Sequence, residues 1–232
     1  MNGIKKEVEK MKQALQTGQA CQQIAGNQLY TPVYDEPVAI AGNREQTECN
    51  YQSYGIPKRY RNVTMEYIVN RGVPEQAKQN VADVQRYIDN LEDNLQNGNG
   101  MVMRGNVGTM KTTLAIAIMR AVIAKGRDAY FIPMANLMDR LFSGTPDERR
   151  NLEQKLQTVS ILVIDDLGME YEKGWVTAKI RAIINDRYNE EKSTIITTNL
   201  EKDINDRYVN GMLDRIASTS TFSNFSGKSL RK

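Results

Sequence analysis

A glycine-rich turn at residues 105–112 limits the folds open to this chain more than any other stretch. It reads Gly105-Asn-Val-Gly-Thr-Met-Lys-Thr112. This fits the pattern of a glycine, four free positions, a glycine, a lysine and a hydroxyl residue at every position but one. The sequence predicts a short strand before the turn, at Met101–Met103, and a helix after it, at Thr112–Ala124. A strand, glycine-rich turn and helix in this order are typical of an α/β fold whose backbone N–H groups bind phosphate.

From residue 101 onward, predicted strands alternate with predicted helices. The further strands are Ala129–Ile132, Ile161–Ile164, Thr194–Thr197 and, near the end, Thr221–Phe225; the further helices are Ala135–Phe142, about Pro146–Gln157 and Val176–Tyr188. The strand at Ile161–Ile164 is apolar throughout, as expected of a strand buried on both faces. Such alternation predicts a central parallel β-sheet flanked by helices. One more helix is predicted ahead of it, from about Pro74 to Gln96.

Residues 1–53 differ from the rest in being polar and rich in glutamine. A short amphipathic helix is predicted over residues 4–15, and it either docks on a partner or lies on its own domain. Residues 25–53 show little periodicity and are interpreted as a linker. We therefore predict two parts, a helical appendage with a linker at 1–53 and an α/β domain at 54–232.

Two adjacent acids, Asp165 and Asp166, follow the apolar strand at Ile161–Ile164. The carboxyl ends of parallel strands meet at one edge of a sheet, so these acids are expected beside the glycine-rich turn. Asp165 and the Thr112 hydroxyl are predicted to bind Mg²⁺, and Asp166 is predicted to activate water. Lys111 is expected between the β- and γ-phosphates of ATP. The residues expected around the phosphates are Gly105, Asn106, Val107, Gly108, Thr109, Met110, Lys111, Thr112 and Thr113.

Three further polar residues are candidates for catalysis. Asn199 follows the strand at Thr194–Thr197, where its amide could orient the attacking water. Arg215 and Arg231 are candidates for the arginine with which many ATPases stabilise charge on the transferring phosphate.

Met110 is the one departure from the loop pattern, because it stands where the pattern has a glycine. A glycine there permits any backbone angle, whereas a methionine disfavours positive φ. The loop could still close if residue 110 keeps a negative φ, and we expect it to hold phosphate less tightly. Met110→Gly is predicted to tighten ATP binding.

Composition excludes several other classes of site and indicates the compartment in which the chain acts. With no histidine and two cysteines, Cys21 and Cys49, the chain can form neither a Ser-His-Asp triad nor a histidine-ligated zinc site. A net charge of +3 does not by itself indicate a nucleic-acid partner. No apolar run reaches about 18 residues, so no membrane contact is predicted, and the charged start of the chain lacks a secretion signal. The cytoplasm is the expected compartment.

Together these motifs resemble those of the AAA+ ATPases that load bacterial replicative helicases, DnaC and DnaI, and of their relative IstB, a transposase helper. The resemblance covers about residues 55–232. It rests on the turn, the paired acids, the strand ending at Asn199 and the segment Leu213-Asp-Arg-Ile216. Gly55-Ile-Pro-Lys-Arg-Tyr-Arg-Asn62 and Gly227-Lys-Ser-Leu-Arg231 resemble the segments that open and close the family's ATPase core.

The resemblance implies an AAA+ P-loop NTPase fold and three roles. Asn199 would be sensor 1, Arg215 the arginine finger that reaches a neighbouring subunit's ATP, and Arg231 the sensor 2 residue that contacts the γ-phosphate in the same chain. It further implies ATP-dependent self-association, single-stranded DNA binding, and docking of the N-terminal part on a DnaB-type helicase.

Tyr171 and Lys173 are the candidates for contact with DNA. They lie on the loop Gly168–Gly174, where a tyrosine could stack on a base and a lysine could meet phosphate, although a merely solvated loop is equally compatible.

Three functions remain open at this point. The first is a helicase loader, which we favour. The second is an IstB-like transposase helper, disfavoured because residues 201–210 lack tryptophan. The third is a nucleotide-binding adaptor with little hydrolysis, suggested by Met110 and by Asp166, which is shorter than the usual glutamate.

Overall fold

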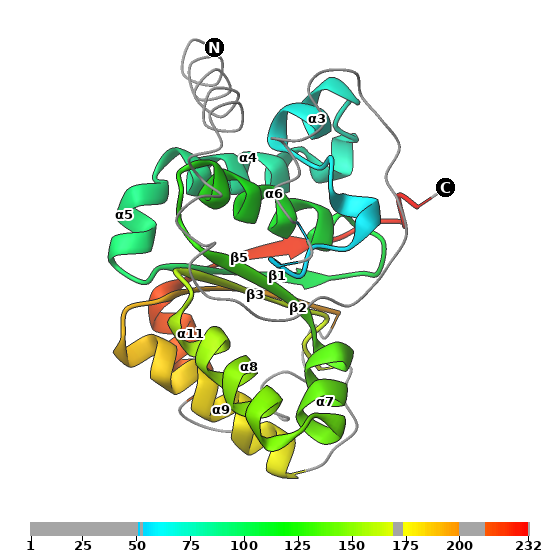
Figure 1. Ribbon diagram of the computed structural model, residues 1–232. Helices are drawn as coiled ribbons and strands as arrows, with labels where there is room; N and C mark the ends of the chain where they lie inside the picture. The colour runs from blue at the N-terminus through cyan, green and yellow to red at the C-terminus, as the bar shows by residue number, and fades with distance from the viewer. Residues whose placement is uncertain (1–50, 52, 169–173, 200–211, 232) are drawn as a thin grey trace, which may run out of the picture.

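The computed structural model describes residues 51, 53–168, 174–199 and 212–231 (Figure 1). Five parallel strands form one sheet in the order β2-β3-β4-β1-β5. Their bounds are β1 Gly100–Gly105, β2 Ala129–Pro133, β3 Ile161–Asp165, β4 Ser193–Thr198 and β5 Ser220–Phe225. The predicted parallel sheet is therefore confirmed, and the strands extend one to three residues beyond their predicted ranges. The helix predicted at 4–15 lies outside the described residues, and the boundary at 53/54 stays a prediction.

Helices cover both faces of the sheet, as Figure 1 shows. On one face lie α3 Met65–Asn70, α4 Lys78–Asp89, α5 Leu91–Gln96 and α6 Lys111–Ala124. On the other lie α7 Met134–Ser143, α8 Pro146–Thr158, α9 Gly174–Asn189 and α11 Met212–Thr219. Strand β1 shows how the two cores arise, because successive side chains point to opposite faces. Met101 and Met103 pack on the α6 side, and Val102 packs on the α9 side.

The single helix predicted from Pro74 to Gln96 is wrong in detail. The segment forms a short 3₁₀ helix, η2 Glu75–Ala77, followed by the separate helices α4 and α5. The break falls at Asn90, whose backbone leaves helical angles (φ −105°, ψ 28°) and whose side-chain amide donates to the Arg86 carbonyl at 2.9 Å. Asparagine competes in this way for helix carbonyls, so a side chain overrode the apolar periodicity.

Strand β4 lies between β1 and β3. Its register pairs Met103 with Thr197 on one side and Ile164 with Ile196 on the other. The carboxyl ends of β1, β4 and β3 therefore lie side by side at one edge. This brings the glycine-rich turn, Asn199 and the paired acids together.

The outer edge of β2 is covered by the segment that opens the described region. The Phe131 backbone N–H donates to the Tyr54 carbonyl at 2.8 Å. Gly55 has a φ of 76°, and a Cβ there would lie 2.1 Å from the Phe131 carbonyl oxygen. Only glycine fits this close approach, which pairs the edge and protects it from other chains.

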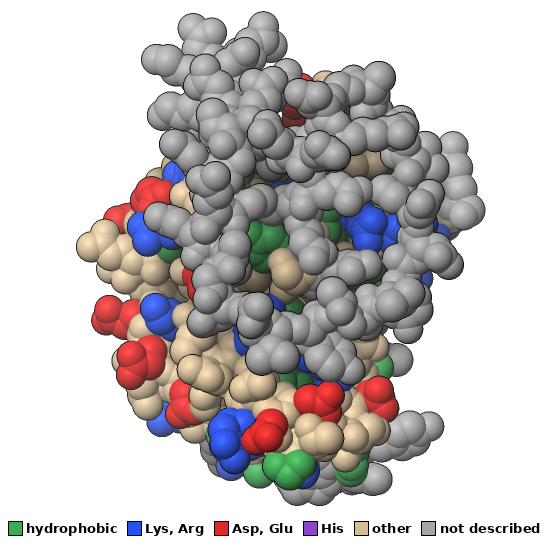
Figure 2. All heavy atoms as spheres, in the orientation of Figure 1, with side chains coloured by type: hydrophobic (Ala, Val, Ile, Leu, Met, Phe, Trp, Pro, Cys, Tyr) green, Lys and Arg blue, Asp and Glu red, His purple; other side chains and the backbone are tan. Residues whose placement is uncertain are grey.

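Within the described part of the chain, no helix combines the length and apolar character needed to span a membrane. Figure 2 shows acidic and basic side chains interspersed over the lower part of the face in view. Lys179 on α9 and Glu153 on α8 form an ion pair, with their charged atoms 2.6 Å apart.

Candidate nucleotide site

Lys111 is the first residue of α6 and lies at the centre of the glycine-rich turn. It is buried, and its Nζ donates to the carbonyls of Gly105 and Asn106, each at 2.7 Å. The turn thus wraps around its own lysine. The positive charge is held where a phosphate on the turn's backbone N–H groups would meet it.

The pKa of Lys111 reports its surroundings. Burial lowers this pKa below the usual value for lysine, while the negative charges of Asp166 and Asp165 oppose the shift. The positive charge of Arg231 lowers it further. Asp165, Asp166 and Arg231, which the sequence predicts for metal binding and catalysis, are therefore close enough to act on Lys111 electrostatically.

Met110 takes a left-handed backbone conformation, with a φ of 78° and a ψ of 8°. The loop therefore closes with a positive φ at residue 110, and not with the negative φ considered from the sequence. The surroundings impose the geometry: the Met110 carbonyl accepts the Leu114 N–H at 2.9 Å to begin α6, and its side chain packs against the core on that face. A residue with a Cβ is disfavoured by about 1–2 kcal/mol in this conformation.

A pair of substitutions at residue 110 measures this strain. We expect Met110→Gly to have a free energy of unfolding about 1 kcal/mol higher than Met110→Ala, because both lose the methionine's packing and only alanine keeps the strained Cβ. Inside an ordinary helix the order is reversed, with alanine the more stable by about 1 kcal/mol. Urea unfolding of the two variants is the measurement, and an alanine variant at least as stable as the glycine variant would contradict the strain. That Met110→Gly also tightens ATP binding stays a prediction.

Asp165, at the end of β3, is buried and held by two hydroxyl groups. Its Oδ1 accepts from Thr197 Oγ1 at 2.6 Å and from Thr112 Oγ1 at 2.9 Å. Burial raises the pKa of Asp165, and the neighbouring charge of Asp166 adds to the rise. The hydrogen bonds from Thr197 and Thr112 and the charge of Lys111 oppose it. The structure thus brings together Thr112 and Asp165, the two residues predicted to bind Mg²⁺.

Asp166 and Asn199 also lie together. Asn199 Nδ2 donates to Asp166 Oδ1 at 3.1 Å, and the Asp166 backbone N–H donates to Thr197 Oγ1 at 2.9 Å. Asp166 has a φ of 56°, so the chain turns sharply after the strand. The Thr197 hydroxyl therefore contacts both acids at once, through the carboxylate of Asp165 and the backbone of Asp166.

Sequence reasoning missed Thr197, although the sequence carries a signal for it. Thr197 and Thr198 are both fully buried polar residues on β4, a strand that is apolar at Ile195 and Ile196. A buried hydroxyl normally has a hydrogen-bond partner, so polar residues at the end of such a strand indicate a built site.

Residues 226–231 follow β5 and lie against the glycine-rich turn. The sequence did not predict this contact. The Leu230 N–H donates to the Gly108 carbonyl at 2.9 Å, and Asn106 Nδ2 donates to the Gly227 carbonyl at 3.1 Å. A Cβ at Gly108 would lie 2.1 Å from the Ser229 hydroxyl. This packing places Arg231 near Lys111.

Arg215 is not part of this group. It lies on α11, shortly before β5 begins at Ser220, and therefore at the opposite, amino-terminal end of the sheet. Its guanidinium lies 5.7 Å from the centre of the Tyr188 ring, and Arg215 lines a cavity of about 380 Å³ together with Lys192 and Thr194. The predicted DNA contacts Tyr171 and Lys173 lie outside the described residues.

The turn and the acids fit a nucleotide with Mg²⁺. Gly105 and Gly108 have φ angles of 134° and 80°, which open the turn, and the buried lysine supplies positive charge. The Thr112 hydroxyl and the Asp165 carboxylate are oxygen donors, the kind of ligand that Mg²⁺ takes.

Comparison with known proteins agrees with this geometry. The chain is 29% identical over 152 residues to the replicative helicase loader DnaC of Buchnera aphidicola subsp. Schizaphis graminum, a match that covers 63% of this chain and 59% of that protein. It is 27% identical over 135 residues to a Mycobacterium tuberculosis protein named as an ATP-binding protein in an insertion sequence, covering 54% of this chain and 53% of that one. The match thus spans less than two thirds of the curated relatives' length.

Similarity of structure and of family leads to the same group. A crystal structure of the DnaC helicase loader superimposes with a TM-score of 0.64 at 27% identity, covering 73% of this chain and all of that one. The resemblance to AAA+ P-loop ATPases is therefore confirmed for the fold. The family model described as IstB-like ATP binding protein matches residues 43–232. The chain therefore belongs to the IstB-like ATP-binding family of AAA+ proteins.

Proposed function

We propose that this protein is an ATPase that loads a DnaB-type replicative helicase onto single-stranded DNA, and that it acts in the cytoplasm. One observation carries the proposal: β4 lies between β1 and β3, so that Lys111, the paired acids and Asn199 gather at one edge of the sheet. Similarity to DnaC, named as a replicative helicase loader, supports the choice of helicase as the partner.

The chain's own residues would divide the chemistry as follows. Lys111 would exchange its two carbonyl partners for the β- and γ-phosphates, while the turn's backbone N–H groups hold the phosphate chain. The Thr112 hydroxyl and Asp165 would hold Mg²⁺, which neutralises charge on the phosphates when bound. Asp166 would accept a proton from the attacking water, and Asn199, which donates to Asp166 at 3.1 Å, would help to orient that water.

The two arginines would act in different chains. Arg231 lies near enough to Lys111 to shift its pKa, which suits contact with the γ-phosphate in the same chain. Arg215 lies at the other end of the sheet, so it could complete only a neighbouring subunit's site. We therefore propose self-association through the ATP site, with Tyr171 and Lys173 as contacts for single-stranded DNA.

Size-exclusion chromatography with a DnaB-type helicase tests this function. We expect the full chain to elute with the helicase hexamer when ATP is present, and the complex to place the helicase on circular single-stranded DNA. Lys111→Ala should fail in the ATP-dependent step while still eluting as a folded protein. A wild-type chain that binds no DnaB-type helicase, with or without ATP, would refute the proposal.

A transposase helper is the second candidate. The family description and the M. tuberculosis relative from an insertion sequence favour it. It requires that the protein stimulate a transposase on duplex DNA, an assay in which a helicase loader should be inactive. The third candidate, an adaptor with little hydrolysis, would bind ATP without turning it over, whether or not DNA is present.

A further inference from the structure

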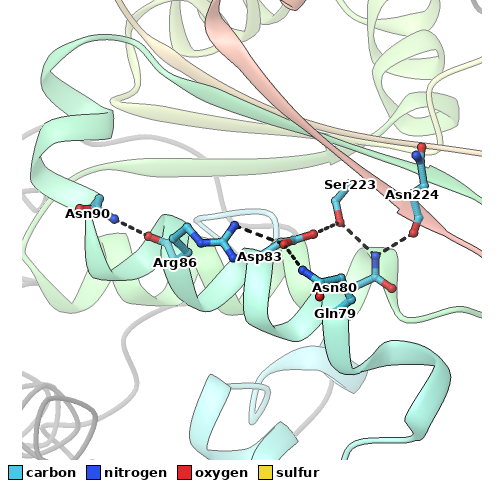
Figure 3. A network of polar contacts seen from close by, with 7 residues as sticks. All are labelled: Gln79, Asn80, Asp83, Arg86, Asn90, Ser223 and Asn224. Atoms are coloured by element: carbon cyan, nitrogen blue, oxygen red, sulfur yellow. Dashed lines mark hydrogen bonds and ion pairs between the residues drawn. The ribbon is translucent and has the colours of Figure 1, made fainter.

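Helix α4 holds the edge strand β5 through buried polar side chains, as Figure 3 shows. Asn80 Nδ2 donates to Ser223 Oγ at 3.0 Å and to the Asn224 carbonyl at 2.8 Å. The Ser223 hydroxyl in turn donates to Asp83 Oδ2 at 3.0 Å. Asn80 is only 5% exposed and Ser223 only 2%, so the bond between these two side chains is buried, where an unmade hydrogen bond costs most. They fix the strand to the helix.

Gln76 lies one helical turn before Asn80, on the side of residues 226–231, which follow β5. It lies on η2, four residues before Asn80, and its Nε2 donates to the Lys228 carbonyl at 2.7 Å. A Cβ at Gly227 would lie 2.5 Å from Gln76 Oε1, so the side chain lies directly against that backbone.

The same backbone segment contacts the glycine-rich turn on its other side. The Phe225 carbonyl accepts the Asn106 N–H at 3.0 Å, and the Gly227 carbonyl accepts Asn106 Nδ2 at 3.1 Å. The Leu230 N–H then donates to the Gly108 carbonyl at 2.9 Å. Residues 225–230 therefore lie between η2 and α4 on one side and the turn at 105–112 on the other.

We propose that Gln76 and Asn80 are positioning residues for the nucleotide site, which act through residues 225–230. The proposal rests on the proposed function only in taking residues 105–112 as the ATP site. The bond from Leu230 uses the Gly108 carbonyl and not an N–H group, so it does not compete with phosphate for the donors of the turn. The same segment carries Arg231 to its place near Lys111. If the hydrogen bond from Gln76 to the Lys228 carbonyl is lost, residues 225–230 support the turn less firmly and hold Arg231 less well in place.

Gln76→Glu is the sharpest test, because it keeps the shape of the side chain and removes the N–H that donates to Lys228. Gln76 is exposed, so the variant is expected to fold. Gln85→Glu is the matched control: it is the same substitution on α4, and the Gln85 amide donates to Asp89 at 2.8 Å, outside the contacts among Asn80, Asp83 and Ser223. Titration with a fluorescent ATP analogue and with the matching ADP analogue gives the affinities, and thermal unfolding gives the stability.

We expect Gln76→Glu to weaken ATP binding about five-fold, roughly what loss of one hydrogen bond allows. ADP binding should weaken less, because Arg231 is proposed to contact the γ-phosphate. Amide hydrogen exchange without nucleotide should become faster at Leu230. The control should leave both affinities within about two-fold and the Leu230 exchange unchanged.

Two results would overturn the proposal. One is unchanged ATP affinity and unchanged Leu230 exchange in Gln76→Glu, and the other is an equal loss of affinity in Gln85→Glu. A wild-type chain that binds no ATP would refute the nucleotide site itself, and the positioning role with it. Failure to bind a helicase, with ATP binding intact, would refute only the loader function and leave the positioning role standing.

Discussion

Arg187→Leu is expected to lower the free energy of unfolding by about 3–5 kcal/mol, because it leaves several buried carbonyl groups without donors. Arg187 lies on α9 and is fully buried. Its NH1 donates to the carbonyls of Leu156 and Val159, each at 2.9 Å, and its NH2 donates to the Ser193 carbonyl at 2.5 Å. Its Nε donates to Thr194 Oγ1 at 3.0 Å.

These bonds join three elements at the amino-terminal end of the sheet. Leu156 lies in the last turn of α8, Val159 lies just before β3, and Ser193 begins β4. Burial lowers the pKa of Arg187 to about 9, which still leaves the guanidinium charged at pH 7 and all its donors in place. One side chain thus fixes the start of two of the strands whose far ends carry the candidate site.

Urea unfolding followed by circular dichroism measures the effect. Arg150→Leu on α8 is the control, since Arg150 is exposed and its ion pair with Asp147, at 3.7 Å, is expected to contribute less than about 0.5 kcal/mol. A loss below about 1 kcal/mol in Arg187→Leu would mean that water or neighbouring groups satisfy the orphaned carbonyls.

Most of the fold could be predicted from the sequence because its signals are local. The apolar run at Ile161–Ile164 and the periodic helices around it specify a parallel sheet without knowledge of distant contacts. The paired acids were located for the same reason, since they directly follow a buried strand and must lie at its carboxyl end.

The rest depends on contacts between residues far apart in the chain. The hydrogen bond from Asn106 to Gly227 joins residues 121 positions apart, and no periodic pattern of apolar residues predicts such a contact. The sign of φ at Met110 could not be read either, because packing and the start of α6 override the preference of an isolated methionine. Arg187 reads as an ordinary surface arginine on a helix until its neighbours are known.

Thr197→Val is expected to lower ATP turnover by about 10–100-fold, the range seen when a group that orients a metal ligand is removed. The change replaces the hydroxyl with a methyl group of similar size, so the core stays filled. Asp165 loses its 2.6 Å hydrogen bond, and the Asp166 N–H loses its acceptor. Both acids should then sample positions outside their present geometry. Lys111 and the turn, which do not contact this hydroxyl in the structure, should keep ATP affinity within about three-fold.

Steady-state ATPase kinetics on Thr197→Val, Thr197→Ser and Thr221→Val separate this role from simple loss of stability. Serine keeps a hydroxyl that can reach both acids, so it should restore most of the turnover, and Lys111→Ala defines the background. Thr221 is exposed near the amino-terminal end of β5, far from the two acids, so its valine variant should match the wild type. If Thr197 only stabilised the fold, the valine variant would lose kcat and ATP affinity together in proportion to its fraction unfolded. A fall in kcat alone, reversed by serine, therefore identifies the hydroxyl as the group that holds the two acids in register.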